Sequence, residues 1–141
     1  MTPLKLPEFD IRLEGESVFC LIRRKWVILT PEEWVRQHFL NLMIHHLGYP
    51  KGLIRLEHGL YYFKNAKRSD ITLLHRDSGV FMVVECKAAT VKIDQKVINQ
   101  VSEYNKVLKA EYIAISNGLS HFIWKYNNAG YQQLKDFPAY V

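Results

Sequence analysis

The chain has 141 residues, of which 48% are hydrophobic and 23% charged, and its net charge is +5. This length supports one domain with its own core, and the composition excludes a disordered chain. The sequence has no apolar run long enough to span a membrane and no apolar secretory signal. We therefore expect a soluble, cytoplasmic domain, with Cys20 and Cys86 as reduced core cysteines.

The first 29 residues predict a β extension, and a helix follows. "FDIRLEGESVFCLIRRKWVIL" indicates short strands, separated by turns at residues 14–16 and 23–25. In "LTPEEWVRQHFLNLMIHHLGYP", Thr30 can cap the helix, Pro31 fits its first position and Glu33 completes a capping box. Gly48 and Pro50 then end it. The apolar residues of this segment recur at helical spacing, so we expect an amphipathic helix.

The rest of the chain predicts three strands, a helix and two more strands. The strand candidates are residues 53–63, 70–75 and 79–87, with a tight turn at residues 77–79. A helix is expected from Asp94 to about Lys109. The segments "EYIAIS" and "HFIWKY" flank Asn117-Gly118, which is a strong hairpin signal. The order predicts a single α/β domain, in which residues 30–141 form a central mixed sheet flanked by helices.

Charged residues gather at one predicted strand end. Pairing the strands so that Arg76 faces Gly79 places Asp70 opposite Glu85, where two carboxylates repel each other. Lys87 projects from the same face as Glu85, because side chains alternate along a strand. Two carboxylates and one ammonium group are therefore expected to meet at one edge of an apolar sheet.

Two interpretations of this cluster remain open on the residues alone. Lys87 can simply neutralise Asp70 and Glu85 in a partly buried salt-bridge cluster, although such clusters add little stability. Alternatively, the two carboxylates hold Mg²⁺, a hard cation that keeps several waters and accepts phosphate oxygens. Lys87 would then orient or deprotonate an attacking water, or stabilise the charge that develops on the phosphate.

Three segments carry a resemblance to a known family. "SDITLL", "VVECK" and "INQVSEYN" resemble the PD-(D/E)xK nuclease superfamily, with the spacing D–x14–E–x–K followed by a helix with Q–x–x–x–Y. More narrowly, the chain is similar to the nuclease domain at the N-terminus of type I restriction endonuclease motor subunits. The resemblance runs from Thr30 to Tyr126. Ser69 stands where the motif's name has proline, a position that varies.

The resemblance implies a restriction-endonuclease-like fold with an αβββαβ core and a Mg²⁺- or Mn²⁺-dependent endonuclease acting on DNA. It implies Asp70, Glu85 and the backbone carbonyl of Cys86 as metal ligands, with Lys87 as catalytic base or electrostatic stabiliser. Glu33 is a further candidate ligand, with Glu32 as its rival. The remaining candidates are Gln100 as a catalytic or DNA-contacting residue, Tyr104 as its support, and Lys67 and Arg68 as contacts to the DNA backbone.

Other functions stay open beside this one. The chain can be a catalytically silent nucleic-acid-binding or scaffold module of the same fold, or an unrelated basic interaction domain with a structural cluster. The sequence contains no G-x-x-x-x-G-K-[ST] motif, so it holds no ATP-driven motor of its own. Expected partners are therefore DNA and either a second copy of the chain or a helicase or translocase, without a membrane.

Overall fold

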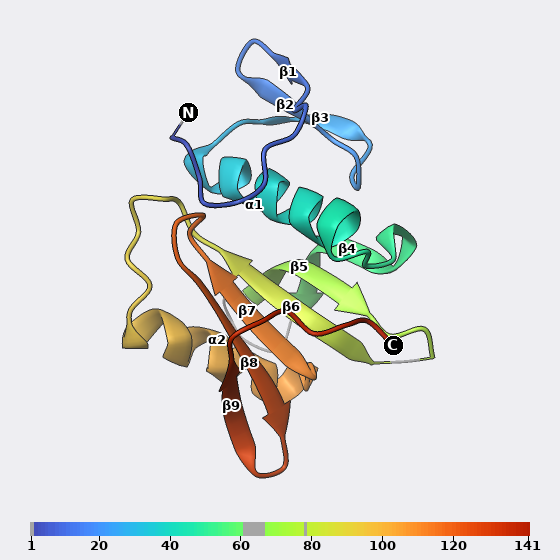
Figure 1. The fold of residues 1–141 in the computed structure, drawn as a ribbon, viewed down its shortest axis with the longest axis vertical. Coiled ribbons are helices and arrows are strands. Elements are labelled where there is room, and N and C mark those ends of the chain that lie inside the picture. The colour runs from blue at the N-terminus through green and yellow to red at the C-terminus, as the bar shows by residue number, and fades with distance from the viewer. Residues whose placement is uncertain (1, 61–66, 78) are drawn as a thin grey trace.

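Two β-sheets and two main helices make up the structure, a computed structural model that describes residues 2–60, 67–77 and 79–141 (Figure 1). Three short strands form a small antiparallel sheet in the order β1 (Leu13–Glu14), β2 (Ser17–Cys20) and β3 (Lys25–Ile28). A larger sheet has the order β4-β5-β6-β7-β8-β9. The small sheet lies on the far side of α1 from the large one (Figure 1).

The first helix begins where the sequence predicts. In α1 (Pro31–Asn41), the Thr30 side chain accepts a hydrogen bond from the Glu33 amide at 3.0 Å, and Pro31 takes the first position. The helix continues as a π-helical turn, Leu42–His46, and Gly48 follows with a φ of +67°. A left-handed conformation is one that glycine adopts without strain, so the predicted helix end is confirmed.

The large sheet is mixed, as predicted. After a short 3-10 turn (Lys51–Leu53), its strands are β4 (Ile54–Leu60), β5 (Lys67–Leu74), β6 (Val80–Cys86), β7 (Tyr112–Ser116), β8 (His121–Asn127) and β9 (Gly130–Leu134). Only β6 and β7 pair in parallel among the described strands, and α2 (Gln95–Leu108) makes the crossover between them. The order α1-β4-β5-β6-α2-β7 confirms the expected α/β fold and its αβββαβ core.

Alternate residues of the central strands bury opposite faces of the large sheet. Met82 and Val84 of β6 belong to the core beneath α1, whereas Val83 belongs to a second core with Val101 of α2. Successive side chains of a strand point to opposite faces, so β6 is buried on both faces of the sheet. The sheet is therefore a middle layer, and the carboxyl end of β6 lies between the two helical layers.

The chain ends reinforce the core beneath α1. The Tyr49 hydroxyl donates to the Pro138 carbonyl at 2.7 Å, and the Tyr140 hydroxyl donates to the Leu74 carbonyl at 2.8 Å. Near the other end, the Lys5 amide donates to the Gly118 carbonyl in the β7–β8 turn. Both terminal segments are thus tied to the large sheet rather than only to their own neighbours.

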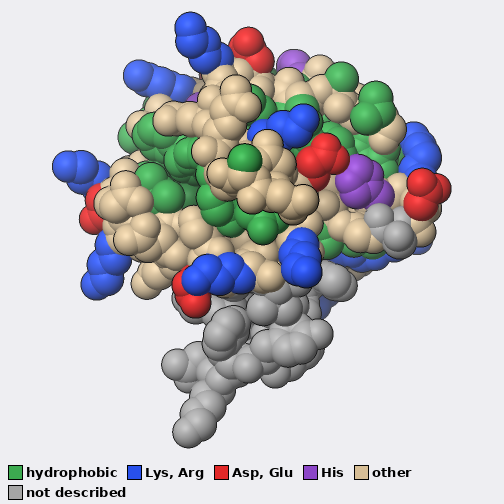
Figure 2. Space-filling view, turned by 90° about the horizontal axis from the view of Figure 1, so that it is seen from below, with side chains coloured by type: hydrophobic (Ala, Val, Ile, Leu, Met, Phe, Trp, Pro, Cys, Tyr) green, Lys and Arg blue, Asp and Glu red, His purple; other side chains and the backbone are tan. Residues whose placement is uncertain are grey.

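On the surface seen from below, the Lys and Arg side chains of the described residues do not gather into one patch. Lys and Arg side chains are spread around the rim of that face, and hydrophobic side chains occupy much of its centre (Figure 2). Among the described residues, no helix combines the length and apolar character needed to cross a bilayer.

Candidate active site at the carboxyl end of β6

Asp70 and the end of β6 meet as the sequence predicts. The β5–β6 ladder pairs Ile71 with Val84 and Thr72 with Val83, which is the register that brings Asp70 level with Glu85. In addition, the Cys86 amide donates to Asp70 Oδ2 at 2.7 Å. This bond fixes the Asp70 carboxylate against the strand that carries the other candidate residues.

The predicted pairing at the turn is wrong by one residue. The His75 amide donates to the Gly79 carbonyl, so Arg76 does not face Gly79. A register shift between Leu73 and Leu74 makes up the difference, because Leu73 pairs with Met82 but Leu74 pairs with Val80. The extra residue of this β-bulge restores the expected register before Asp70.

A single arginine of α1 joins the acidic residues of the site. Arg36 Nη2 donates to Asp70 Oδ1 at 2.9 Å and to Glu32 Oε1 at 3.0 Å, while Nη1 donates to Glu33 Oε1. Burial lowers the pKa of Arg36, but the charges of Asp70 and Glu33 and the hydrogen bond to Asp70 outweigh it and raise the pKa overall. The guanidinium is therefore a permanent positive charge among three carboxylates.

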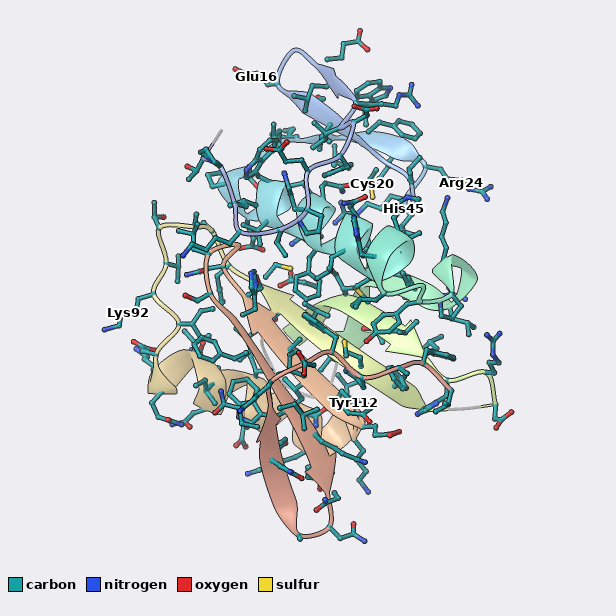
Figure 3. The ribbon with its side chains drawn as sticks, in the orientation of Figure 1. Glu16, Cys20, Arg24, His45, Lys92 and Tyr112 are labelled. Carbon is teal, nitrogen blue, oxygen red and sulfur yellow. The ribbon has the colours of Figure 1, made fainter. Side chains whose placement is uncertain are left out.

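Glu33 is enclosed by donors. Besides Arg36, its carboxylate accepts from Gln37 Nε2 at 2.9 Å and from Arg23 Nη1 at 3.0 Å. Arg23 belongs to the β2–β3 turn, whose next residue, Arg24, points outward at the edge of the molecule (Figure 3). The predicted capping box is only half formed, because the Thr30 amide donates to the Ile28 carbonyl instead of to Glu33. The Glu33 carboxylate is committed to side chains of the site.

Glu32 faces the same cluster from a more open position, with 46% of its side chain exposed. Partial burial raises its pKa, and the nearby Asp70 raises it further, while Arg36 and Lys87 act in the opposite direction. Glu32 therefore lies within electrostatic reach of Asp70 and Lys87. The first helix supplies two acids to the site, of which Glu32 is the accessible one.

Lys87 and Glu85 are neighbours at the strand end. Lys87 Nζ lies 3.3 Å from Glu85 Oε1, and the Lys87 amide donates to the Ser116 carbonyl of β7 at 2.8 Å. The parallel pairing of β6 with β7 thus fixes the backbone of Lys87. Both side chains keep part of their surface in solvent, so a substrate has access to them.

The Cys86 thiol takes no part as an anion. It is fully buried, and burial followed by the charge of Asp70 raises its pKa well above the usual range. A protonated thiol is a poor metal ligand. The predicted contribution of Cys86 comes from its backbone carbonyl, so the protonated thiol does not bear on it. The amide of the same residue is bound to Asp70.

The comparison with protein families decides the assignment. The family described as "Type I restriction enzyme R protein N terminus" matches residues 31–138. The chain belongs to this family. No curated protein is similar enough to the chain to count as a match. The matched range contains α1, the large sheet and α2, whereas residues 1–30, with the small sheet, lie outside it.

The other residues that the family resemblance suggests are placed less closely. Gln100 lies on α2 with an exposed side chain. Tyr104 lies on the same helix and Lys67 and Arg68 on β5, but their side chains are outside the described part of the structure. The roles proposed for these residues from the family motif therefore stay predictions.

The oxygen donors at the strand end suit the metal that the resemblance to the nuclease superfamily implies, but their arrangement is not that of a metal site. Carboxylate and carbonyl oxygens are the ligands that Mg²⁺ and Mn²⁺ prefer. Among the described residues, however, no group of three or more His, Cys, Asp and Glu side chains has the arrangement of a metal site. The Arg36 guanidinium stands between Asp70 and Glu32 instead.

Arg36 is the site residue that the sequence analysis missed. Its spacing from Glu32 and Glu33 is that of ordinary helix-surface ion pairs, so the sequence alone predicts only local pairing. The one available signal is that Arg36 follows a stripe of buried positions, since Val35 and Phe39 are core residues. Because Arg36 is itself buried, its charge needs partners, and Asp70 is the one that lies far along the chain.

Proposed function

We propose that this member of the type I restriction enzyme R protein N-terminal family is a metal-dependent nuclease that hydrolyses phosphodiester bonds in DNA. The observation that carries the proposal is the meeting of Asp70, Glu85 and Lys87 at the carboxyl end of β6. An acid pair beside a lysine, partly open to solvent, has the groups needed for hydrolysis of a phosphate ester.

In this proposal the oxygen ligands come from Asp70, Glu85 and the Cys86 carbonyl. A bound Mg²⁺ or Mn²⁺ would supply Lewis acidity to the phosphodiester and would lower the pKa of an attacking water. Glu32 is the better placed of the two helix acids to assist, because Glu33 already accepts hydrogen bonds from three side chains. We therefore prefer Glu32 to Glu33 as the supporting acid.

Lys87 acts on the attacking water or on the developing phosphate charge. Its ammonium group is held near Glu85, and its backbone is held by Ser116, so it is directed at the same strand end as the acids. Gln100 and Tyr104 would support this group from α2. Lys67 and Arg68, which are separated from Asp70 by Ser69, would hold the DNA backbone.

The proposal also assigns partners. Type I restriction enzymes are assemblies, so a helicase or translocase segment or subunit is the natural partner, and a second copy of the chain is the other possibility. DNA is the proposed substrate. We propose the cytoplasm as the place where the protein acts on it.

One observation favours a second candidate function, a catalytically silent DNA-binding module of the same fold. The carboxylate of Asp70 is engaged on both oxygens, by Arg36 and by the Cys86 amide. If Asp70 stayed engaged in this way, it could not bind a metal together with Glu85, and the site would lack one of its two proposed carboxylate ligands. The two functions differ in metal binding and in cleavage.

Cleavage of supercoiled plasmid with Mg²⁺ or Mn²⁺ tests the proposal. Wild-type protein is expected to nick or linearise the plasmid, EDTA to stop the reaction, and Lys87→Ala to lose at least about 100-fold in rate, as is typical when a group for proton transfer is removed. Lys92→Ala, on an exposed loop, is the matched control (Figure 3). Equal rates for Lys87→Ala and wild type would overturn the assignment.

A further inference from the structure

The guanidinium of Arg36 is buried in an arrangement that is incomplete. Only 7% of its side chain is exposed, and its two Nη atoms serve Asp70, Glu32 and Glu33. Its Nε is a buried donor without an acceptor in the part of the chain that the structure describes. An unsatisfied buried donor is costly, and a guanidinium has five N–H donors. The position therefore does not satisfy Arg36 completely.

The charges explain why a cation has to occupy this position. Asp70, Glu32 and Glu33 each place a carboxylate oxygen on the same guanidinium. Without a positive charge between them, these acids would repel one another, and water screens Asp70 and Glu33 poorly because both are largely buried. In the metal-free site, Arg36 therefore neutralises the carboxylates, which a divalent cation would do once bound.

We infer that Arg36 is the resident cation of this site and that it competes with the divalent metal for Asp70 Oδ1. The inference rests on the proposed function, because it concerns the metal that the nuclease would use. A guanidinium and a divalent cation repel each other, so both cannot remain in close contact with the same oxygen. Asp70 Oδ2 keeps its bond to the Cys86 amide in either state, since the competition concerns Oδ1 alone.

Glu33 gives the displaced guanidinium a place to stay. Arg36 Nη1 is bound to Glu33, and Glu33 is in turn held by Gln37 and by Arg23 of the β2–β3 turn. Loss of the contact with Asp70 therefore need not release Arg36 into solvent. Glu33 is the anchor of Arg36 in this scheme, and the N-terminal extension, which lies outside the family match, contributes to that anchor through Arg23.

Competition makes a prediction that a purely structural role does not. Arg36→Gln removes the resident charge, so the metal-free protein is expected to lose at least about 4 °C in its melting temperature. The same variant is expected to bind Mn²⁺ at least about tenfold more tightly than wild type, because Asp70 Oδ1 and the local negative charge become available. A purely structural arginine would give losses in both quantities.

Isothermal calorimetry with Mn²⁺ alone and thermal unfolding without metal measure these two changes. Arg55→Gln is the matched control, since it removes a guanidinium that donates to the Gly52 and Ile54 carbonyls rather than to a carboxylate of the site. It is expected to leave the affinity for Mn²⁺ within about twofold of wild type. Asp70→Asn in either background is expected to abolish binding.

A second measurement uses the wild-type protein and so does not depend on the folding of a variant. Nitrogen-15 NMR of the arginine side chains, followed during a Mg²⁺ titration, is expected to show the Arg36 Nη signals shifting and exchanging faster as the bond to Asp70 is lost. Signals of Arg55, which donates to the carbonyls of Gly52 and Ile54, serve as the internal reference.

The outcomes separate this inference from the proposed function. Binding of Mn²⁺ by wild type that Arg36→Gln leaves unchanged or weakens, or Arg36 signals that do not respond to Mg²⁺, would overturn the competition and leave the nuclease proposal standing. Absence of Mn²⁺ binding by both wild type and Arg36→Gln would overturn the metal site, and with it both proposals.

Discussion

At the scale of residues, the site depends on a carboxylate that is almost fully buried. Glu33 is only 7% exposed and accepts from two guanidinium groups and an amide. Removal of one partner from a buried ion network leaves charges unpaired, which costs far more than the loss of a surface pair. The stability of the whole cluster therefore depends on Glu33, which holds Arg23, Arg36 and Gln37 together.

Glu33→Gln tests this dependence. The variant keeps the shape of the side chain but leaves Arg23 and Arg36 without its charge, so we expect the free energy of unfolding to fall by about 3 kcal/mol. Urea unfolding followed by circular dichroism measures the change. Glu103→Gln, which breaks the exposed pair with Lys106, should cost less than about 1 kcal/mol. Equal effects in the two variants would contradict a buried network.

The sequence predicts these residues unevenly, and the reason is the distance over which each interaction acts. Asp70, Glu85 and Lys87 lie within one hairpin, so counting outward from its turn brings them close together. The expected register is reached, however, only because the bulge offsets the wrong pairing at the turn. Arg36 is positioned by Asp70, which lies 34 residues further along the chain, and no local pattern encodes that contact. In the sequence, Glu32 and Glu33 have the spacing of ion pairs on a helix surface, so they suggest only a local role for Arg36.

At the scale of elements, α2 ends in a conformation that its residue does not favour. Lys109 has a φ of +52° at the C-cap, where its amide donates to the Asn105 carbonyl. A side chain with a Cβ atom in this left-handed region costs roughly 1 kcal/mol relative to glycine. The predicted end of the helix at Lys109 is confirmed, but the usual glycine is missing from it.

Lys109→Gly should stabilise the protein by about 0.5–1 kcal/mol, since relief of the left-handed strain exceeds the loss of one charge near the helix end. Chemical unfolding monitored by tryptophan fluorescence gives the free energy. Lys106→Gly, in the last turn of the same helix but at a position that is still helical, should change stability in the opposite direction by a similar amount. A loss of stability in both variants would refute the assigned cap.

Elements with a pattern of their own are the ones that the sequence predicts. The capping residue Thr30, the amphipathic α1 and the Asn117-Gly118 hairpin all have local causes, and the structure confirms them. β9 was not predicted, because its middle residues are exposed on both faces and give no alternating signal. The bulge between β5 and β6 was missed for the related reason that a single extra residue leaves the apolar run intact.

At the scale of the whole molecule, the positive charge is dispersed over the one face that Figure 2 shows. The net charge is +5, yet Lys and Arg are spread around the rim of the face in Figure 2. Binding to DNA through such a surface is expected to be non-specific and strongly dependent on salt. Specificity would then have to come from a partner rather than from this domain.

The charge reversals Lys67→Glu and Arg68→Glu, made together, should weaken DNA binding and flatten its salt dependence. Each lost phosphate contact lowers the slope of log K against log salt by about 0.9, so a decrease of about 2 is expected. Fluorescence anisotropy with labelled duplex at several salt concentrations measures the slope. The matched control reverses Lys106 and Lys109, near the C-terminal end of α2. A slope that both double variants change equally would remove Lys67 and Arg68 from the DNA surface.

The parallel pairing of β6 with β7 also sets the order in which the site is built. Asp70 and the end of β6 come together within a local hairpin, whereas the Lys87 amide finds Ser116 only after the whole of α2 has been made. Contacts between distant parts of a chain form late, since loop closure must precede them. On the ribosome, therefore, α1 and the β5–β6 hairpin can gather the acids around Arg36 first. The backbone of Lys87 is fixed last, so the cluster at the end of β6 is complete only once β7 has emerged.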